Sequence, residues 1–134
     1  MKNPGAQISD TEWEIMRIVW KRHPISAADI IAALVAEDAT WHPKTARTLL
    51  NRLVRKQALA YEKDGRVYHY RPLVREADCI AHQSESFLDR VFGGSLTPLL
   101  AHFVSRQKLK PEEVDELRSL LSSADRNRPT RKKK

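Results

Sequence analysis

The 134-residue sequence predicts a mainly α-helical fold with one small β-hairpin, organised in two parts. Two observations carry this prediction. Apolar residues recur at helical spacing in six separate stretches, and two short runs rich in Tyr and Val flank an Asp-Gly pair near the middle of the chain. The predicted order is three helices, a hairpin and three further helices.

The first predicted helix begins after Ser9 and ends near Arg22. Ser9 and Glu12 have the spacing of a capping box, in which each side chain bonds the backbone N–H of the other residue. The helix ends at His23 because a residue before proline is pushed out of the helical region. Its apolar face consists of Trp13, Met16, Val19 and Trp20.

Two further helices follow. Ser26 is placed to cap a helix over residues 27–37, and Pro43 suits the first position of a helix that ends near Gln57, because that position needs no N–H donor. The apolar stripe of the second helix is Ile30, Ile31, Leu34 and Val35. The third helix has an apolar face of Ala46, Leu49, Leu50, Leu53 and Val54, and a polar face of Lys44, Thr45, Arg47, Thr48, Asn51, Arg52 and Arg55.

The hairpin is predicted from the runs Leu59–Lys63 and Arg66–Arg71, which are separated by Asp64-Gly65. An Asp-Gly pair between such runs is a strong hairpin signal, because the turn needs a positive φ. Three helices followed by a hairpin are the order of a winged helix-turn-helix domain. We place this domain at residues 1–72.

The second part, residues 73–124, is predicted to contain three helices. They cover residues 74–92, about 97–107, and 111 onward. Gly93-Gly94 stops the first of them, and Pro98 and Pro111 stand in the first turns of the other two. Residues 125–134 are polar and basic, so they are predicted to form a disordered tail.

The net charge of +7 is concentrated in one internal block and in the tail. Residues 43–75 carry nine basic side chains against Glu62 and Asp64, whereas the segments on either side of this block are acidic. Concentrated positive charge indicates a polyanionic partner, of which nucleic acid is the most common. The cluster from Arg131 to Lys134 either adds non-specific DNA affinity or serves only to keep the protein in solution.

The composition argues against several other classes of protein. The chain has no apolar run of ~18 residues and no N-terminal stretch of the secretory kind, so we expect a cytoplasmic protein without membrane insertion. Cys79, the only cysteine, is interpreted as a core or interface residue. The five histidines lack metal-binding spacing, and no phosphate loop or nucleophile pattern stands out. We therefore expect no catalytic residue, no metal and no cofactor.

The third helix has the form of a DNA-recognition helix. The major groove of B-DNA admits one α-helix, in which Arg pairs with guanine, Asn with adenine and the Thr methyl group with thymine. The hairpin is a candidate wing against the phosphate backbone. A merely solvated face is the alternative, but such faces usually mix both signs of charge, and residues 43–61 contain no acid. The predicted contacts to double-stranded DNA are Lys44, Thr45, Arg47, Thr48, Asn51, Arg52, Arg55, Lys63 and Arg66.

The second part is predicted to form a homodimer. Its roughly fifty residues make a poor independent core, although closure of the three apolar stripes within one chain stays open as an alternative. A symmetric dimer would read two half-sites about one helical turn apart. The residues predicted to form the dimer interface are Ile80, Phe87, Leu88, Val91, Leu99, Leu100, Phe103, Leu117 and Leu120.

Three functions compete at this point. The first is a repressor that occupies a palindromic operator. The second is a non-specific nucleoid-associated or RNA-binding winged-helix protein that uses the same basic surface and tail. The third, a nuclease, is disfavoured because the basic face lacks clustered carboxylates and metal-spaced histidines.

Several stretches resemble the penicillinase-repressor family, the BlaI/MecI/CopY group of bacterial repressors. Residues 41–53 read WHPKTARTLLNRL, which is similar to the family's recognition-helix pattern W-x-P-K-T-x-R-T-L-x-x-R-L. Similar segments are EIMRIVW at 14–20, KDGRVYHY at 63–70, GGSL at 93–96 and LAHFV at 100–104. The resemblance covers about residues 8–122.

The resemblance implies a homodimer that binds dyad operators in front of genes for β-lactam resistance and related functions. It implies base or phosphate contacts for Lys44, Thr45, Arg47, Thr48 and Arg52. In the β-lactam branch, a membrane-bound sensor metallopeptidase, or a protease that it activates, leads to cleavage before a phenylalanine in the middle dimerisation helix. By position, that bond is His102–Phe103 here, and those relatives carry Asn where this chain has His102. The Cys-x-Cys metal motifs of the copper-responsive branch are not in this sequence.

Overall fold

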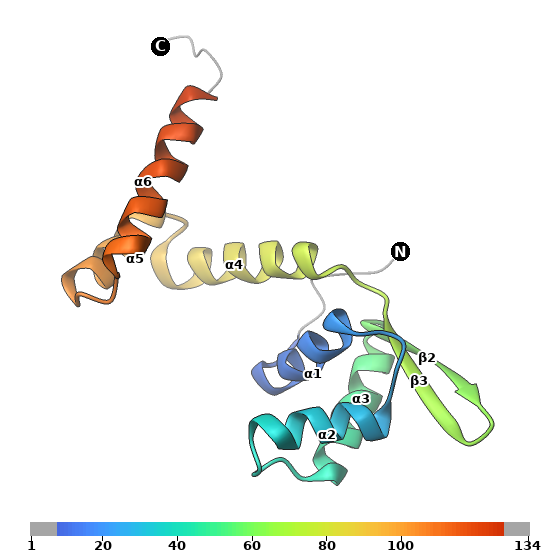
Figure 1. Cartoon of the computed structure of the whole chain (residues 1–134). Helices are drawn as coiled ribbons and strands as arrows, with labels where there is room; N and C mark the ends of the chain where they lie inside the picture. The colour runs from blue at the N-terminus through green and yellow to red at the C-terminus, as the bar shows by residue number, and fades with distance from the viewer. Residues whose placement is uncertain (1–7, 128–134) are drawn as a thin grey trace. The chain divides into compact units, whose positions relative to one another are not determined.

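The computed structural model describes residues 8–127 (Figure 1). Its elements are α1 (Asp10–Lys21), β1 (Ile25–Ser26), α2 (Ala27–Glu37), α3 (Pro43–Arg55), β2 (Leu59–Asp64), β3 (Val67–Pro72), α4 (Glu76–Phe92), α5 (Leu96–Ser105) and α6 (Pro111–Arg126). The predicted mainly helical fold with one small hairpin is confirmed. Among residues 8–127, no helix is both long and apolar enough to cross a bilayer.

Local signals set the helix ends as the sequence predicts. The Glu12 N–H donates to Ser9 Oγ at 3.2 Å and the Ser9 N–H donates to Glu12 Oε1 at 2.9 Å, so the capping box is complete. Ser26 Oγ caps α2 by accepting from the Asp29 N–H at 3.1 Å. Pro43 opens α3 as its first residue.

The end of α6 corrects the predicted start of the tail. The helix includes Asp125 and Arg126, which the sequence analysis assigns to disorder from residue 125 onward. The helical pattern continues because the Asn127 N–H still reaches Ser123 O at 3.0 Å, and the next proline is only at position 129. The basic cluster from Arg131 to Lys134 lies outside the described residues.

The turn of the hairpin lies one residue further along than predicted. Asp64 pairs with Val67, so the two turn residues are Gly65 and Arg66. Gly65 has φ +66 and Arg66 is not among the residues with positive φ, a combination typical of a type II′ turn. Asp64 is therefore the last residue of β2.

The sheet has a third strand that the sequence analysis missed. β1 pairs antiparallel with β3, placing Ile25 opposite Tyr70 and Ser26 opposite His69, and the strand order is β1-β3-β2. Two residues are too few to show a periodic pattern. The short strand ties the start of α2 to the hairpin.

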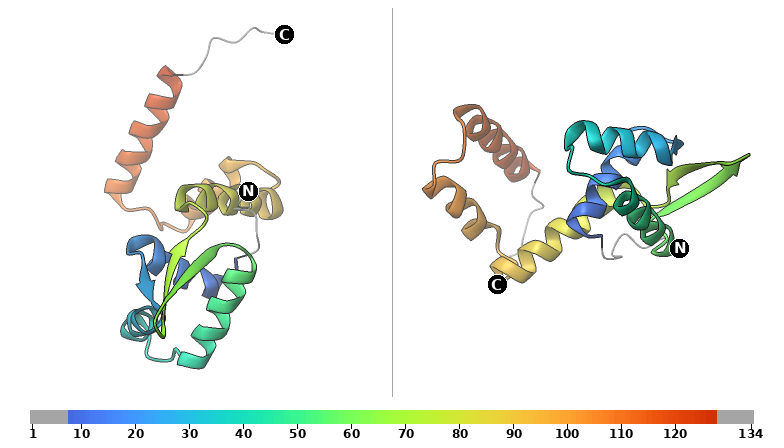
Figure 2. Two further views of the ribbon diagram at one scale, coloured as in Figure 1. Left: turned by 90° about the vertical axis from the view of Figure 1, so that its right-hand side faces the viewer. Right: turned by 90° about the horizontal axis from the view of Figure 1, so that it is seen from below.

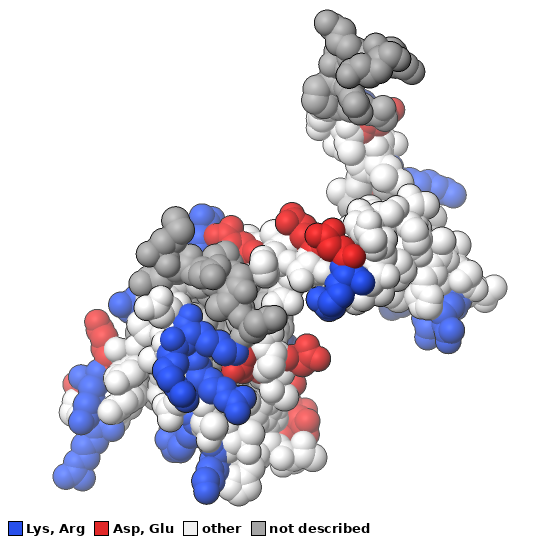
Figure 3. Space-filling model, turned by 180° about the vertical axis from the view of Figure 1, so that it is seen from behind, with Lys and Arg blue, Asp and Glu red and all other residues white. Residues whose placement is uncertain are grey.

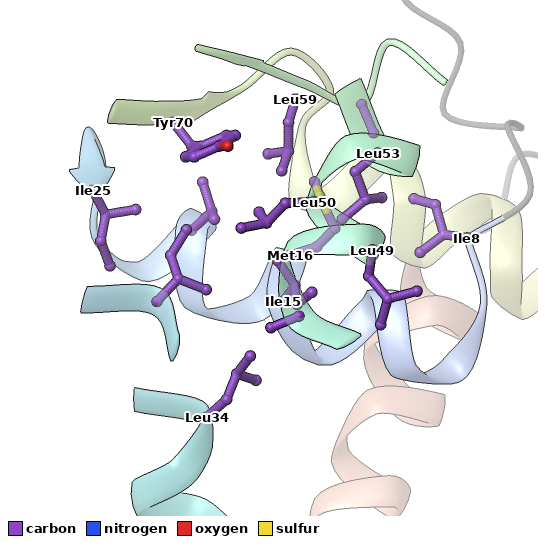
Figure 4. Close-up of a cluster of buried hydrophobic side chains, with 14 of the residues drawn as sticks. Ile8, Ile15, Met16, Ile25, Leu34, Leu49, Leu50, Leu53, Leu59 and Tyr70 are labelled. Atoms are coloured by element: carbon purple, nitrogen blue, oxygen red, sulfur yellow. The ribbon is translucent and has the colours of Figure 1, made fainter. Parts of the chain in front are cut away.

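One hydrophobic core holds the first part together, with side chains converging from α1, α2, α3 and the sheet (Figure 4). Val74 and Cys79 are also buried in it, and Trp20 Nε1–H donates to Val74 O at 3.0 Å. The chain accordingly divides into two compact units between Ser86 and Phe87, further along than the join predicted at residue 72. The largest fully buried side chains include Ile15, Met16, Val19, Ile30, Leu34, Leu50, Leu53 and Leu59.

The second unit differs from the first in how little it buries. No residue of α5 or α6, both described in full, is buried. Within one chain, these helices therefore leave much of their three apolar stripes exposed. Several large apolar side chains of α4, α5 and α6 are exposed: Ile80, Phe87, Val91, Leu96, Phe103, Val104, Leu120 and Leu121.

The end of α3 allows a stability test. The Ala58 N–H donates to Leu53 O and the Gln57 N–H to Val54 O, both at 3.0 Å, which is a Schellman motif with Gln57 at φ +65. Glycine relieves the strain of this left-handed conformation, so Gln57→Gly should raise the free energy of unfolding by roughly 0.5–1 kcal/mol. The matched change inside α4, Gln83→Gly, should lower it by about 1 kcal/mol. Chemical denaturation measures both, and effects of the same sign would contradict the assignment.

Candidate nucleic-acid interface

α3 separates its apolar and polar faces as the sequence predicts. Ala46, Leu49, Leu50 and Leu53 are at most 6% exposed, and Val54 is half-buried. The opposite face points to solvent. All seven polar residues predicted on this face are exposed: Lys44, Thr45, Arg47, Thr48, Asn51, Arg52 and Arg55.

The first turn of α3 is held by two residues that precede it. His42 is the N-cap, because its Nδ1 accepts from the Lys44 N–H at 3.1 Å. Trp41 Nε1–H donates to Glu14 Oε1 at 3.3 Å and so attaches the loop before α3 to α1. The sequence analysis did not assign these roles, since histidine is an uncommon cap and the Trp41 contact spans distant positions. Together they hold Lys44 and the start of the recognition surface in place.

The wing carries an ordered aromatic surface beside its basic residues. Lys63 and Arg66 are both exposed, as predicted, and Figure 2 shows the hairpin extending away from the helices of the first unit. Lys63 Nζ lies 5.8 Å from the ring centroid of Tyr68, and the Tyr68 ring stacks on Tyr61 with centroids 4.6 Å apart. Side chains alternate between the two faces of a strand, so the sequence could have predicted that Tyr61, Lys63 and Tyr68 lie on the same face of the hairpin.

A cleft of about 580 Å³ lies between α3 and the wing. Arg47 and Asn51 line it from α3, Arg66 and Tyr68 line it from the hairpin, and Ser26 lies at its edge beside the start of α2. The two guanidinium groups give the cleft positive charge. The structure thus brings together three predicted residues that lie up to 19 positions apart in the sequence.

The electrostatics of this surface are dominated by basic groups that remain available to a ligand. None of the ion pairs found among residues 8–127 uses a residue predicted to contact DNA. Burial raises the pKa of the Tyr70 hydroxyl beside the cleft, and the nearby Arg47 charge only partly offsets this effect. Figure 3 shows Lys and Arg side chains over the first unit, whereas charged side chains are sparser on the second unit.

The predicted cleavage and dimerisation residues all lie on α4, α5 and α6. His102 and Phe103 are exposed near the end of α5. Of the other residues predicted for the interface, Ile80, Phe87, Val91 and Leu120 are exposed, whereas Leu88, Leu99, Leu100 and Leu117 are half-buried.

The first unit is thus a winged helix-turn-helix with an exposed basic recognition helix. The penicillinase repressor family model matches residues 8–123. The chain is 41% identical over 115 residues to the penicillinase repressor of Bacillus licheniformis, covering 86% of this chain and 89% of that protein. It is 36% identical over 122 residues to the methicillin resistance regulatory protein MecI of Staphylococcus aureus, covering 91% and 98%. The chain belongs to the penicillinase repressor family, as its sequence motifs predict.

A solved structure supports the fold of the first unit. The DNA-binding domain of the repressor BlaI matches with a TM-score of 0.52 and 44% sequence identity, over 58% of this chain and 93% of that domain. The winged helix-turn-helix predicted from the order of helices and hairpin is confirmed.

Proposed function

We propose that this chain is a transcriptional repressor that binds a palindromic DNA operator. One observation carries the proposal: α3 buries four of the five residues of its apolar face and exposes a polar face with three arginines, one lysine and no acid. A surface of this kind matches the major groove in shape and charge. The relatives support the proposal, since they are repressors and regulators of penicillinase and methicillin resistance.

The arrangement of α3 and the wing supports a proposed mode of docking. With α3 in the major groove, Arg47, Thr48 and Asn51 face the base edges. One sugar–phosphate strand then lies beside the wing at the mouth of the cleft, where Arg66 supplies positive charge. The chain acts in this way as a binding protein, and we assign it no catalytic step.

A homodimer is the second part of the proposal. The exposed apolar side chains of α4, α5 and α6 cost free energy in water, and a second copy would cover them. Two-fold symmetry would then present two recognition helices to the two halves of a palindrome.

Release by proteolysis is the third part of the proposal. The His102–Phe103 bond belongs to α5, which follows α4 and precedes α6 in the chain, and both side chains are exposed. A cut there separates α6 from the rest of the proposed dimer interface and so weakens operator binding. The protease would be a membrane-bound sensor metallopeptidase or an enzyme that it activates, and the regulated genes would concern β-lactam resistance or a related stress.

Salt dependence and site selection test the proposed repressor. If ~6–10 phosphates are neutralised, affinity should fall ~10³–10⁵-fold between ~50 and ~200 mM salt. A duplex selected from a random pool by the wild-type protein should contain two related half-sites and should bind more tightly than its scrambled sequence. Gel-shift titrations measure both properties. Selection without any preferred sequence would instead favour the non-specific nucleoid or RNA-binding alternative.

One arginine variant and one lysine variant separate base reading from phosphate binding. Arg47→Ala should weaken binding to the selected duplex by about 1–3 kcal/mol and relax its base preference, with a smaller effect on the scrambled duplex. Lys63→Ala on the wing should weaken both duplexes about equally and reduce the slope of log K against log salt by about 1. Anisotropy titrations give the four affinities. Equal losses on the two duplexes for Arg47→Ala would remove Arg47 from base reading.

A charge placed on the predicted interface tests the dimer. Phe87→Glu should convert the protein to a monomer at micromolar concentration, because the carboxylate would be desolvated between two copies. His82→Glu is the matched control, since His82 is exposed on the same helix outside the predicted interface. Sedimentation equilibrium gives the two masses. A Phe87→Glu variant with the same mass as wild type would contradict the role of this residue.

A further inference from the structure

The most deeply buried charge of the first unit is not one of the proposed DNA contacts. Glu12, in the first turn of α1, has an exposed fraction of 0%. Its Oε1 accepts from the Ser9 N–H at 2.9 Å and from Lys56 Nζ at 2.6 Å. Its Oε2 is also buried and has no hydrogen-bonding partner among residues 8–127.

Lys56 stands at the junction between the recognition helix and the wing. It is the C-cap of α3, and it is followed by the left-handed Gln57 and then by β2, which begins at Leu59. Its side chain is 31% exposed. The ion pair therefore joins the start of α1 to the point where the direction of the chain changes from α3 into the wing.

Glu12 is ionised at neutral pH. Burial raises the pKa of Glu12, but the hydrogen bonds from Lys56 and Ser9 and the Lys56 charge together hold it below its ordinary value. The pair therefore stabilises the folded protein above the usual pKa of a glutamate, and this contribution is lost as the pH falls through the lowered value.

Stability alone accounts poorly for such a pair. Well-packed apolar side chains of similar volume are often as stabilising as a buried ion pair, and an unsatisfied buried oxygen adds a further cost. An ion pair has, however, one property that apolar contacts lack. Its charged hydrogen bonds require one geometry, whereas apolar side chains can repack in more than one way at a small cost in stability.

We propose that the Glu12–Lys56 pair positions α3 and the wing relative to α1, and that the discrimination between operator and other DNA depends on it. Both are positioning residues, and neither is assigned a contact to bases. The inference rests on the proposed function, because only a protein that reads sequence has discrimination to lose.

The test compares stability with discrimination. Glu12→Leu combined with Lys56→Met replaces the pair by apolar side chains. Its free energy of unfolding and its affinity for the scrambled duplex should stay close to those of wild type. Its preference for the selected duplex should fall about tenfold, the size of one misplaced base contact. Arg17→Met is the matched control: it breaks the exposed Arg17–Glu37 pair at 3.6 Å and should change none of the three quantities.

Each other outcome has a definite meaning. A folded double variant with undiminished preference would overturn the positioning role, and an equal loss on both duplexes would show that Lys56 contacts phosphate instead. If the double variant does not fold, Glu12→Gln answers the same question, because it keeps the side-chain volume while removing the charge. A wild-type protein without any sequence preference would contradict the proposed function itself, which separates that failure from a failure of this inference.

Discussion

The burial of the apolar face of α3 in the core of the first unit is the constraint on which the rest of the structure depends. Leu50 and Leu53 are at most 1% exposed, and burying a leucine side chain stabilises a fold by about 1.5–3 kcal/mol. Since side chains repeat every 3.6 residues around a helix, the same burial turns the arginines and threonines outward. A single packing interaction therefore contributes to stability and creates the surface proposed to meet DNA.

The hairpin and α2 are tied to this core by short contacts between distant segments. Ser26 pairs with His69 in the sheet and also caps α2, so one residue links the wing to the helix before α3. Trp41 bonds Glu14 at the start of α3, and Lys56 bonds Glu12 at its end. Both ends of the recognition helix are thus attached to α1, which makes α1 the reference for the whole surface.

The two units satisfy their apolar side chains in different ways. The first unit closes a core from six elements and the beginning of α4, whereas α5 and α6 bury no residue. The first unit thus has a closed core, whereas the second leaves several large apolar side chains exposed. In the proposed homodimeric repressor, this division would make the affinity for a two-fold operator depend on association between copies, and a cut in the second unit would weaken DNA binding through that dependence.

The sequence by itself determined the order of the helices, the hairpin, both faces of α3 and the family. Local sequence signals predict these features: a capping box at Ser9, a proline at position 43, an Asp-Gly pair and apolar residues that repeat at helical spacing. Local signals misplaced the turn by one residue and ended the last helix two residues early, because an Asp-Gly pair fits more than one turn register and helix ends fray. Only the tertiary structure decided the strand β1, the cleft between α3 and the wing, the cap at His42 and the buried pair of Glu12 with Lys56. Apart from the cap, these features join residues far apart in the chain, and no periodicity or short motif records which distant partner a side chain will meet.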